Sequence, residues 1–394
     1  MTELLRLKLE VNDKFQQHYN KAPQFVSAAP GRINIIGEHT DYNFGLALPA
    51  AINRWVIISM AFREDSEIHI HSENYGSQMV FIPNNPFTET ESWTKYIHGA
   101  LDIFAKKDKL NRGFDALIWG NVPLGAGVSS SAAIEVAMMN LLRTSFQATF
   151  DDITLVKNCQ KIEHEYLKVK SGLLDQYASQ FSKEGKLMVL DFKSLTHEYV
   201  DADMGDWCWI LANTKVKREL AGSKYSERVV ETQMGLNQLS NTNTQIEGFR
   251  DVTVNDLGSI TDLVNRKRLK HLVYENIRVY NTAQAFKLKD MEKIGELLLE
   301  SHYSLKNDYE VSCKELDFLV ETGKKVKGWA GGRMMGGGFG GCTINLVKKE
   351  AIDSFSETIL KEYNLKFGIE AELYIFDTAA GAKCDVLQPY ASRV

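Results

Sequence analysis

The stretch NVPLGAGVSSSAA, Asn121–Ala133, lies between two segments with different hydrophobic patterns. FDALIWG before it predicts a strand, and AAIEVAMMNLLRTSF after it predicts an apolar helix. Gly125 and Gly127 would let the backbone approach an anion closely, and Ser129–Ser131 fall where the unpaired N–H groups of the helix point outward. A capped helix after a tight turn would look the same locally. A second anion-suited segment favours a phosphate loop, formed by Gly125, Ala126, Gly127, Val128, Ser129, Ser130 and Ser131.

That second segment is GWAGGRMMGGGFGGC, with seven glycines between Gly331 and Gly341. It matches the letters G-x-G-x-x-G, but no clear strand precedes it in the sequence and the strand-like CTINLV follows it. This context argues against a dinucleotide-binding fold. So many glycines favour backbone packed closely against a ligand or the phosphate loop, with packing against another segment as the alternative. The chain has no G-x-x-x-x-G-K-[ST] motif, so amides, hydroxyls and a metal would have to neutralise bound phosphates.

Two acids stand in apolar surroundings, where a carboxylate is unfavourable unless it is paired or bound to a cation. Glu163 borders the apolar stripe of the helix predicted for DDITLVKNCQKIEHEYL, and it is either a Mg²⁺ ligand or the partner of Lys161 or Lys168. Asp175 lies in SGLLDQYASQF, where it is either a buried helix cap or a catalytic base. Spacing alone leaves both alternatives open.

The composition of the chain argues for small-molecule ligands. Its 394 residues fit two domains, placed at 1–200 and 201–394, with the boundary near 195–205. The formal net charge of −5 is spread without blocks, which argues against nucleic-acid and anionic-membrane partners. The five cysteines stand far apart and no segment has the pattern of an export signal or a membrane span. We therefore expect a cytoplasmic protein with reduced thiols.

The segment APGRINIIGEHTDYNFG, Ala29–Gly45, surrounds an apolar Ile33–Ile36 run with four polar side chains: Arg32, Glu38, His39 and Asp41. Charged and amphoteric groups on an anchored backbone suit a ligand with several hydroxyls. Extended to GRINIIGEHTDYNFGLALPAAI, the segment resembles the galactokinase signature. PLGAGVSSSAA resembles the phosphate loop of the GHMP small-molecule kinases, and GGRMMGGGFGGC resembles their third motif. Order and spacing of the three agree, and the resemblance covers essentially the whole chain.

The resemblance implies both a fold and an activity. The fold would be α/β (α+β) with two domains: a ribosomal-protein-S5-like N-terminal domain with a left-handed βαβ unit, and a C-terminal α/β sandwich. ATP and sugar would meet between them. The activity would be ATP-dependent phosphorylation of the anomeric hydroxyl of α-D-galactose, the first committed step of galactose catabolism in the Leloir pathway. An N-acetylgalactosamine kinase and a non-catalytic galactose and ATP sensor are the alternatives. The implied partners are galactose and MgATP, with a monomeric chain and neither nucleic acid nor membrane.

The resemblance also assigns roles to single residues. Asp175 and Arg32 would flank the 1-hydroxyl, with Asp175 as its proton acceptor. Trp93 would lie beside the adenine, and Glu163 and Ser131 would hold Mg²⁺, although Ser130 is a close rival for Ser131. The implied sugar contacts are Glu38 and His39 at the 6-hydroxyl end, Asp41 at the 3- and 4-hydroxyls, and Gly172 and Tyr225 closing the pocket.

Overall fold

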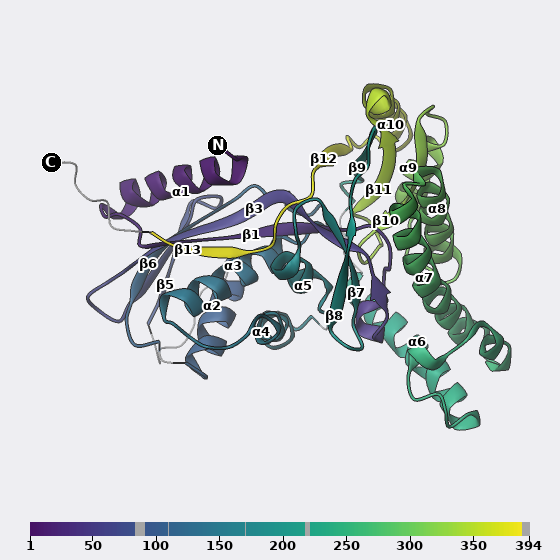
Figure 1. Ribbon diagram of the computed structural model, residues 1–394, viewed down its shortest axis with the longest axis horizontal. Coiled ribbons are helices and arrows are strands. Elements are labelled where there is room, and N and C mark those ends of the chain that lie inside the picture. The colour runs from purple at the N-terminus through teal and green to yellow at the C-terminus, as the bar shows by residue number, and fades with distance from the viewer. Residues whose placement is uncertain (83–90, 109, 170, 217–220, 388–394) are drawn as a thin grey trace.

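The first half of the chain is built on a six-stranded sheet with the order β13-β1-β3-β6-β4-β5 (Figure 1). The computed structural model describes residues 1–82, 91–108, 110–169, 171–216 and 221–387. The strands of this sheet are β1 (Phe25–Asn34), β3 (Pro49–Phe62), β4 (Ile68–Ser72), β5 (Ser77–Phe81), β6 (Phe114–Gly120) and β13 (Lys383–Val386). Its neighbouring strands are antiparallel except β4 and β6, which run parallel.

The central strand β3 is buried on both faces because helices cover both sides of the sheet. Ile57 packs into the core shared with α1 (Glu3–Tyr19), whereas its neighbour Ile58 belongs to the core on the opposite face. This alternation follows from the two-residue repeat of a strand. Figure 1 shows α1 on one face and the other helices of this half on the second. Those helices are α2 (Ser92–Ala105), α3 (Ser130–Ser145), α4 (Asp152–Glu165) and α5 (Leu174–Phe181).

The parallel pair β4 and β6 is joined by a connection that includes β5 and α2. A parallel pair requires a long crossover connection, usually a helix, because the chain must return to the end of the sheet at which the first strand began. This unit corresponds to the βαβ crossover implied by the resemblance, and its left-handedness stays a prediction.

The second half contains an antiparallel four-stranded sheet with the order β10-β11-β9-β12. Trp209 and Leu211 of β9 face α7 and α8, whereas Ile210 and Ala212 face α9 and α10. The strands are β9 (Trp207–Asn213), β10 (Trp329–Met335), β11 (Cys342–Lys348) and β12 (Glu372–Phe376). The helices are α6 (Ala221–Thr242), α7 (Leu263–Leu288), α8 (Met291–Asn307), α9 (Lys314–Gly323) and α10 (Ile352–Phe367). No helix in the described part of the chain has both the length and the apolar composition of a membrane span.

One expectation about the glycine-rich segment is wrong: a strand does precede Gly336, because β10 ends at Met335. The usual strand pattern is absent because Gly331 must be small. A Cβ on Gly331 would lie 2.0 Å from the carbonyl oxygen of Gly295 on α8. Arg333, a charged residue, is fully buried in the same strand. The strand CTINLV after the segment is present as β11, so a strand rather than a helix follows the glycines.

The two halves share strands and core rather than meeting at one cut. The last described strand, β13, pairs with β1 of the first sheet, with Ala28 opposite Lys383. A small third sheet consists of β2 (Leu46–Ala47), which falls between β1 and β3 in the sequence, and of β7 (Lys186–Asp191) and β8 (Thr196–Asp201), which fall between β6 and β9. The division into 1–200 and 201–394 stays a prediction.

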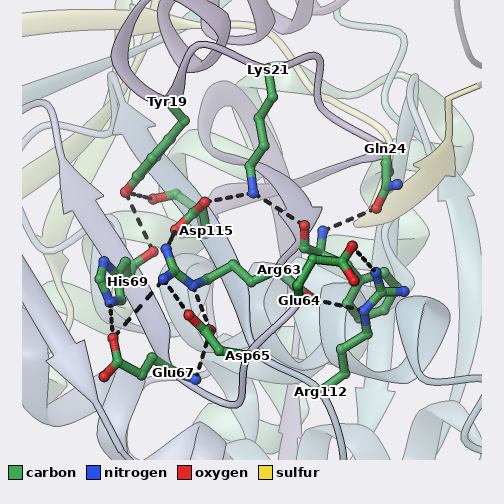
Figure 2. A network of polar contacts seen from close by, with 12 residues as sticks. Tyr19, Lys21, Gln24, Arg63, Glu64, Asp65, Glu67, His69, Arg112 and Asp115 are labelled. Atoms are coloured by element: carbon green, nitrogen blue, oxygen red, sulfur yellow. Dashed lines mark hydrogen bonds and ion pairs between the residues drawn. The ribbon is translucent and has the colours of Figure 1, made fainter.

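A polar network ties the end of α1 to the sheet (Figure 2). Asp115 of β6, with a side chain 6% exposed, lies 2.6 Å from Lys21 Nζ and 2.9 Å from Arg63 Nη1. Tyr19 donates its hydroxyl to the carbonyl oxygen of Ala116, 3.0 Å away. Asp115 is near the start of β6, whereas the phosphate loop follows the end of that strand, so this network lies away from the phosphate loop.

Candidate active site

The phosphate loop borders a cavity of about 660 Å³ that both halves of the chain line. The first half contributes loop residues 123–125 and 127–131 together with Arg32 and Asp175. The second half contributes Asn213, Lys215, Val216, Gly336 and Gly337. The phosphate loop and the glycine-rich segment, predicted separately from the sequence, therefore face one cavity.

The loop ends in an uncapped helix start. Gly125 and Gly127 have φ angles of 74° and 72°, in the left-handed region that favours glycine. Ser129, the residue before α3, is also left-handed at 59° and makes no side-chain hydrogen bond to the helix. The first N–H groups of a helix have no intrahelical partner. Those of α3 can therefore donate hydrogen bonds to phosphate oxygens at the positive end of the helix dipole.

Asp175, in the first turn of α5, is held on both carboxylate oxygens. Arg32 contacts Oδ1 through Nε at 2.9 Å and Nη2 at 2.7 Å. Ser129 donates its hydroxyl to Oδ2. Arg32 also donates Nη1 to the carbonyl oxygen of Gly127, 2.6 Å away, so this cation joins Asp175 to the phosphate loop. An oriented carboxylate beside a fixed guanidinium can accept a proton while the guanidinium stabilises a transferring anion.

Glu38 is buried and connects the segment Ala29–Gly45 (the sugar motif) to the glycine-rich segment. Its Oε1 accepts hydrogen bonds from Arg333 Nη2 at 3.0 Å and from the Gly336 amide at 2.8 Å. Burial alone raises the pKa of Glu38, but the Arg333 charge and the Gly336 amide outweigh it and lower the pKa below its usual value. Glu38 is therefore an anion at neutral pH.

His39 follows in the left-handed conformation, with φ at 64°. Its Nδ1 lies 2.8 Å from the Tyr42 hydroxyl, and its ring packs 4.8 Å from the ring of Tyr309. Burial lowers the pKa of His39 to about 4. The imidazole is therefore neutral at pH 7 and can both donate and accept, as a hydroxyl ligand requires.

Asp41 begins a short 3₁₀ turn, Asp41–Asn43, and faces Gly172. A Cβ on Gly172 would lie 1.8 Å from Asp41 Oδ2, so only glycine fits there without moving the carboxylate. Burial, followed by the charge of Asp175, raises the pKa of Asp41 to about 7. Tyr225 lies in α6, but its side chain is outside the described part of the chain.

The residues assigned to Mg²⁺ offer the oxygen donors that this ion prefers. Glu163 of α4 accepts a hydrogen bond from Ser171, and burial raises its pKa to about 7. Among the described residues the carboxylate is hydrogen-bonded to Ser171 rather than paired with Lys161 or Lys168. Burial and the charges of Glu135 and Glu163 raise the pKa of Tyr96 to about 12, and a hydrogen bond with Ser131 opposes that shift.

Ser131 and Glu163 thus both influence the pKa of the Tyr96 hydroxyl, Ser131 through a hydrogen bond and Glu163 through its charge. Buried Glu135 adds a further carboxyl beside Glu163, and burial raises its pKa well above its usual value. A divalent cation would stabilise these two carboxyls as anions, so carboxylate and hydroxyl oxygens of this kind suit Mg²⁺, although the described residues contain no group of three or more acidic, histidine or cysteine side chains placed around one metal position.

A second cavity, of about 170 Å³, adjoins the first and shares Leu124, Ser130 and Ser131 with it. Trp93 and Tyr75 line it, with their rings stacked at 6.4 Å and 18°. Two flat aromatic side chains next to a phosphate loop suit a planar base.

Several residues around the site could not be identified from the sequence. Arg333 is the clearest: besides Glu38 it donates to the carbonyl oxygens of Asn34 and Ile35, at 2.6 and 2.7 Å. The sequence offered one indication of Arg333, namely that it is the single charged residue in a segment of glycines and methionines. The sequence could not predict the hydrogen bond from Ser129 to Asp175, since Ser129 makes it from a left-handed backbone conformation. Lys215 lines the phosphate cavity as a second cation, paired with Glu372 at 2.7 Å.

Three family models match parts of this chain, and so do many known proteins. The galactokinase galactose-binding signature matches residues 13–62, and the N- and C-terminal domains of GHMP kinases match residues 95–183 and 282–365. Galactokinases of Fusobacterium nucleatum and Bacillus subtilis are each 38% identical, over 90% of this chain and 93% of theirs.

Among solved structures, Lactococcus lactis galactokinase complexed with galactose superposes with a TM-score of 0.89 at 34% identity, covering 96% of this chain and 99% of that one. Methanococcus jannaschii mevalonate kinase, at 18% identity and a TM-score of 0.64, shares the fold. The predicted family and fold class are confirmed: the chain belongs to the galactokinase family of GHMP kinases.

Proposed function

We propose that the chain transfers the γ-phosphoryl group of MgATP to the anomeric hydroxyl of α-D-galactose, releasing ADP and galactose 1-phosphate. The observation that carries this proposal is the Arg32–Asp175 pair: Arg32 belongs to the sugar motif, and the pair is hydrogen-bonded to Gly127 and Ser129 of the phosphate loop. Phosphoryl transfer needs positioning and charge stabilisation more than covalent chemistry from the protein. The described residues are arranged to supply both.

Asp175 accepts the proton of the 1-hydroxyl, or orients that hydroxyl electrostatically, while Arg32 and Ser129 fix its two oxygens. Arg32 also stabilises the negative charge on the phosphoryl group in the transition state of the transfer. The N–H groups at the start of α3 bind phosphate oxygens, and Trp93 packs beside the adenine. Mg²⁺, held by Glu163 and by Ser131 or Ser130, would neutralise the charge of the β- and γ-phosphates.

Sugar recognition rests on three polar side chains with different character. Glu38 is an anion, and with neutral His39 it receives the 6-hydroxyl end. Asp41 receives the 3- and 4-hydroxyls, with Gly172 closing over it. Galactose and glucose differ only in the direction of the 4-hydroxyl, and a polar group left unpaired in a desolvated site discriminates better than shape does. We also propose a cytoplasmic monomer, as the sequence predicts.

The test is ADP release with galactose, N-acetylgalactosamine, glucose and arabinose, together with phosphorus NMR of the product. We expect the highest kcat/KM for galactose and a phosphorus nucleus coupled to the anomeric proton. A higher kcat/KM for N-acetylgalactosamine than for galactose would favour an N-acetylgalactosamine kinase, an alternative that the comparisons do not favour. Binding of galactose and ATP without any ADP release would favour the sensor.

A further inference from the structure

One face of α7 holds the turn that carries Glu38. His271, Glu275 and Val279 are spaced four residues apart, so they lie on one stripe of the helix. The Glu275 Oε1 accepts hydrogen bonds from the amides of Gly37 at 3.0 Å and Glu38 at 3.4 Å. His271 Nε2 lies 3.1 Å from the carbonyl oxygen of Glu38.

The close fit extends to Gly37 itself. Its φ of 99° lies in the region that favours glycine, and a Cβ there would lie 2.9 Å from Val279 Cγ2. Both peptide groups of Glu38 and the backbone before it are therefore in contact with α7. Because the helix comes from the other half of the chain, the sugar motif does not set its own conformation alone.

The Glu275 carboxylate is itself firmly positioned. It is fully buried, and Ser301 of α8 donates its hydroxyl to Oε1 at 2.7 Å. Arg278 contacts Oε2 through Nε at 2.7 Å and Nη2 at 2.6 Å. Burial alone raises the pKa of Glu275, but the nearby positive charges, Arg278 first, and the Ser301 hydrogen bond together outweigh it and lower the pKa to about 2. An ionised acceptor makes stronger bonds to amides than a neutral one.

The side chain of Glu38 is fixed separately, by Arg333 and the Gly336 amide. Its backbone depends on Glu275 and His271. A shift of the turn would therefore misplace both Glu38 and the adjacent His39 without touching the phosphate loop.

We propose that Glu275 is a positioning residue for sugar recognition, which sets galactose affinity by holding the Gly37–Glu38 turn in its binding conformation. The inference rests on the proposed function, because it assumes that Glu38 and His39 contact the sugar. It adds a residue of α7, remote from the three sequence motifs, to the determinants of that contact.

The deciding variant is Glu275→Gln, which keeps the size of the side chain but removes its charge. We expect the galactose Kd, measured by calorimetry without nucleotide, to rise about 10- to 100-fold, since charge-assisted hydrogen bonds to two amides are weakened. The galactose KM should rise with it. The Kd for an ATP analogue should stay within about twofold, because the phosphate loop is untouched.

Thr282→Val is the matched control. Thr282 is buried on the same helix and donates its hydroxyl to the carbonyl oxygen of Arg278 at 2.7 Å, within the helix rather than to the turn. It should lower the melting temperature without changing the galactose Kd. If Glu275→Gln behaves like this control, losing stability with an unchanged galactose Kd, the positioning role is wrong.

A second variant covers the case in which Glu275→Gln does not fold. Ser301→Ala removes one hydrogen bond to the Glu275 carboxylate, and we expect a galactose Kd about two- to fivefold higher. An unchanged Kd in this variant would overturn the proposal. The failure of the proposed function is separate, because it would appear as absence of galactose binding or ADP release in the wild-type protein.

Discussion

Asp175 is the residue whose contacts most directly fix a chemical role. Arg32 holds one of its oxygens and Ser129 the other. Asp175→Asn preserves the shape but removes the ability to accept a proton, so kcat should fall by roughly 10² to 10⁴. The galactose Kd should change little, because the sugar motif is intact. ADP release and calorimetry measure the two effects, and a near-normal kcat would show that Asp175 is not the base.

Asp41 should make the ligand-free protein less stable as the pH rises. Burial and the Asp175 charge raise its pKa to about 7, well above that of an exposed aspartate. Between about pH 4 and 7 the folded state keeps a proton that the unfolded state has lost, so the unfolding free energy falls as the pH increases. Above about pH 7 this contribution no longer changes.

Asp41→Asn removes that proton uptake. We expect the variant to melt at a higher temperature than the wild type at pH 8, with a smaller difference at pH 4. Some pH dependence remains, because burial also raises the pKa of Glu163 to about 7. Asp13→Asn, an exposed site on α1, is the control and should change neither melting curve. Equal melting temperatures of Asp41→Asn and wild type at pH 8 would contradict the raised pKa.

The sequence could indicate site residues only where type and context were unusual. Asp175 and Glu163 stood out as acids in apolar helices. The structure places Asp175 in the lining of the larger cavity, whereas Glu163 is hydrogen-bonded to Ser171. The residues that support them gave no such signal. Ser129 contacts Asp175 because of a left-handed backbone, and Glu275 acts across 238 positions of sequence on the Gly37 amide.

At the scale of elements, the network in Figure 2 anchors the end of α1 to the first sheet. Asp115→Ala would leave Lys21 and Arg63 without their shared, buried carboxylate. Those two side chains are 32% and 23% exposed, which lessens the loss. We expect a loss of about 2 kcal/mol in unfolding free energy, measured in urea, with an unchanged kcat.

Glu64→Ala is the control for this network. Glu64 lies in the same group of residues in Figure 2, but its side chain is fully exposed. The ion pair that the substitution removes is the one with Arg112, whose Nη2 lies 3.5 Å from Glu64 Oε1. Exposed pairs contribute little, so its urea midpoint should match that of the wild type. Equal losses in the two variants, or a reduced kcat in Asp115→Ala, would contradict an anchoring role remote from the site.

The helices and strands with regular apolar repeats were predictable. The helix expected for residues 3–19 is present as α1, and the strand FDALIWG is present as β6. β10 was not predicted, because glycines required by its close neighbours, Gly331 by α8 and Gly332 by β11, replace its strand pattern. The role of α7 was equally hidden, since its buried face carries polar residues such as His271 and Glu275 whose partners lie in another part of the chain.

At the scale of the whole molecule, the site exists only when distant segments meet. The resemblance of the three motifs to those of GHMP kinases implied a two-domain kinase, and the fold class is confirmed. No periodicity could show that β13 returns to the first sheet, because strand pairing depends on long-range contacts. The same holds for the buried pair of Glu38 and Arg333, which are 295 positions apart.

That pair yields a prediction about coupling between the halves. The side chains of Arg333 and Glu38 are 0% and 6% exposed, so removing one partner leaves a buried charge. Arg333→Met and Glu38→Gln should each destabilise the protein, by about 3 to 5 kcal/mol for the buried ion pair. The double variant should lose less than the sum of the two, with a coupling energy of about 1 to 3 kcal/mol in urea unfolding.

The exposed pair Lys293–Glu296, with side chains 47% and 63% exposed, provides the reference cycle. Alanine at both positions should give a coupling below about 0.5 kcal/mol, because solvent screens exposed charges. Arg333 also donates to backbone carbonyl oxygens, so its single loss should exceed that of Glu38. If the losses at Glu38 and Arg333 simply add, each residue is stabilised by its other contacts. The sugar motif and the glycine-rich segment would then be joined through the Gly336 amide and α7 rather than through this ion pair.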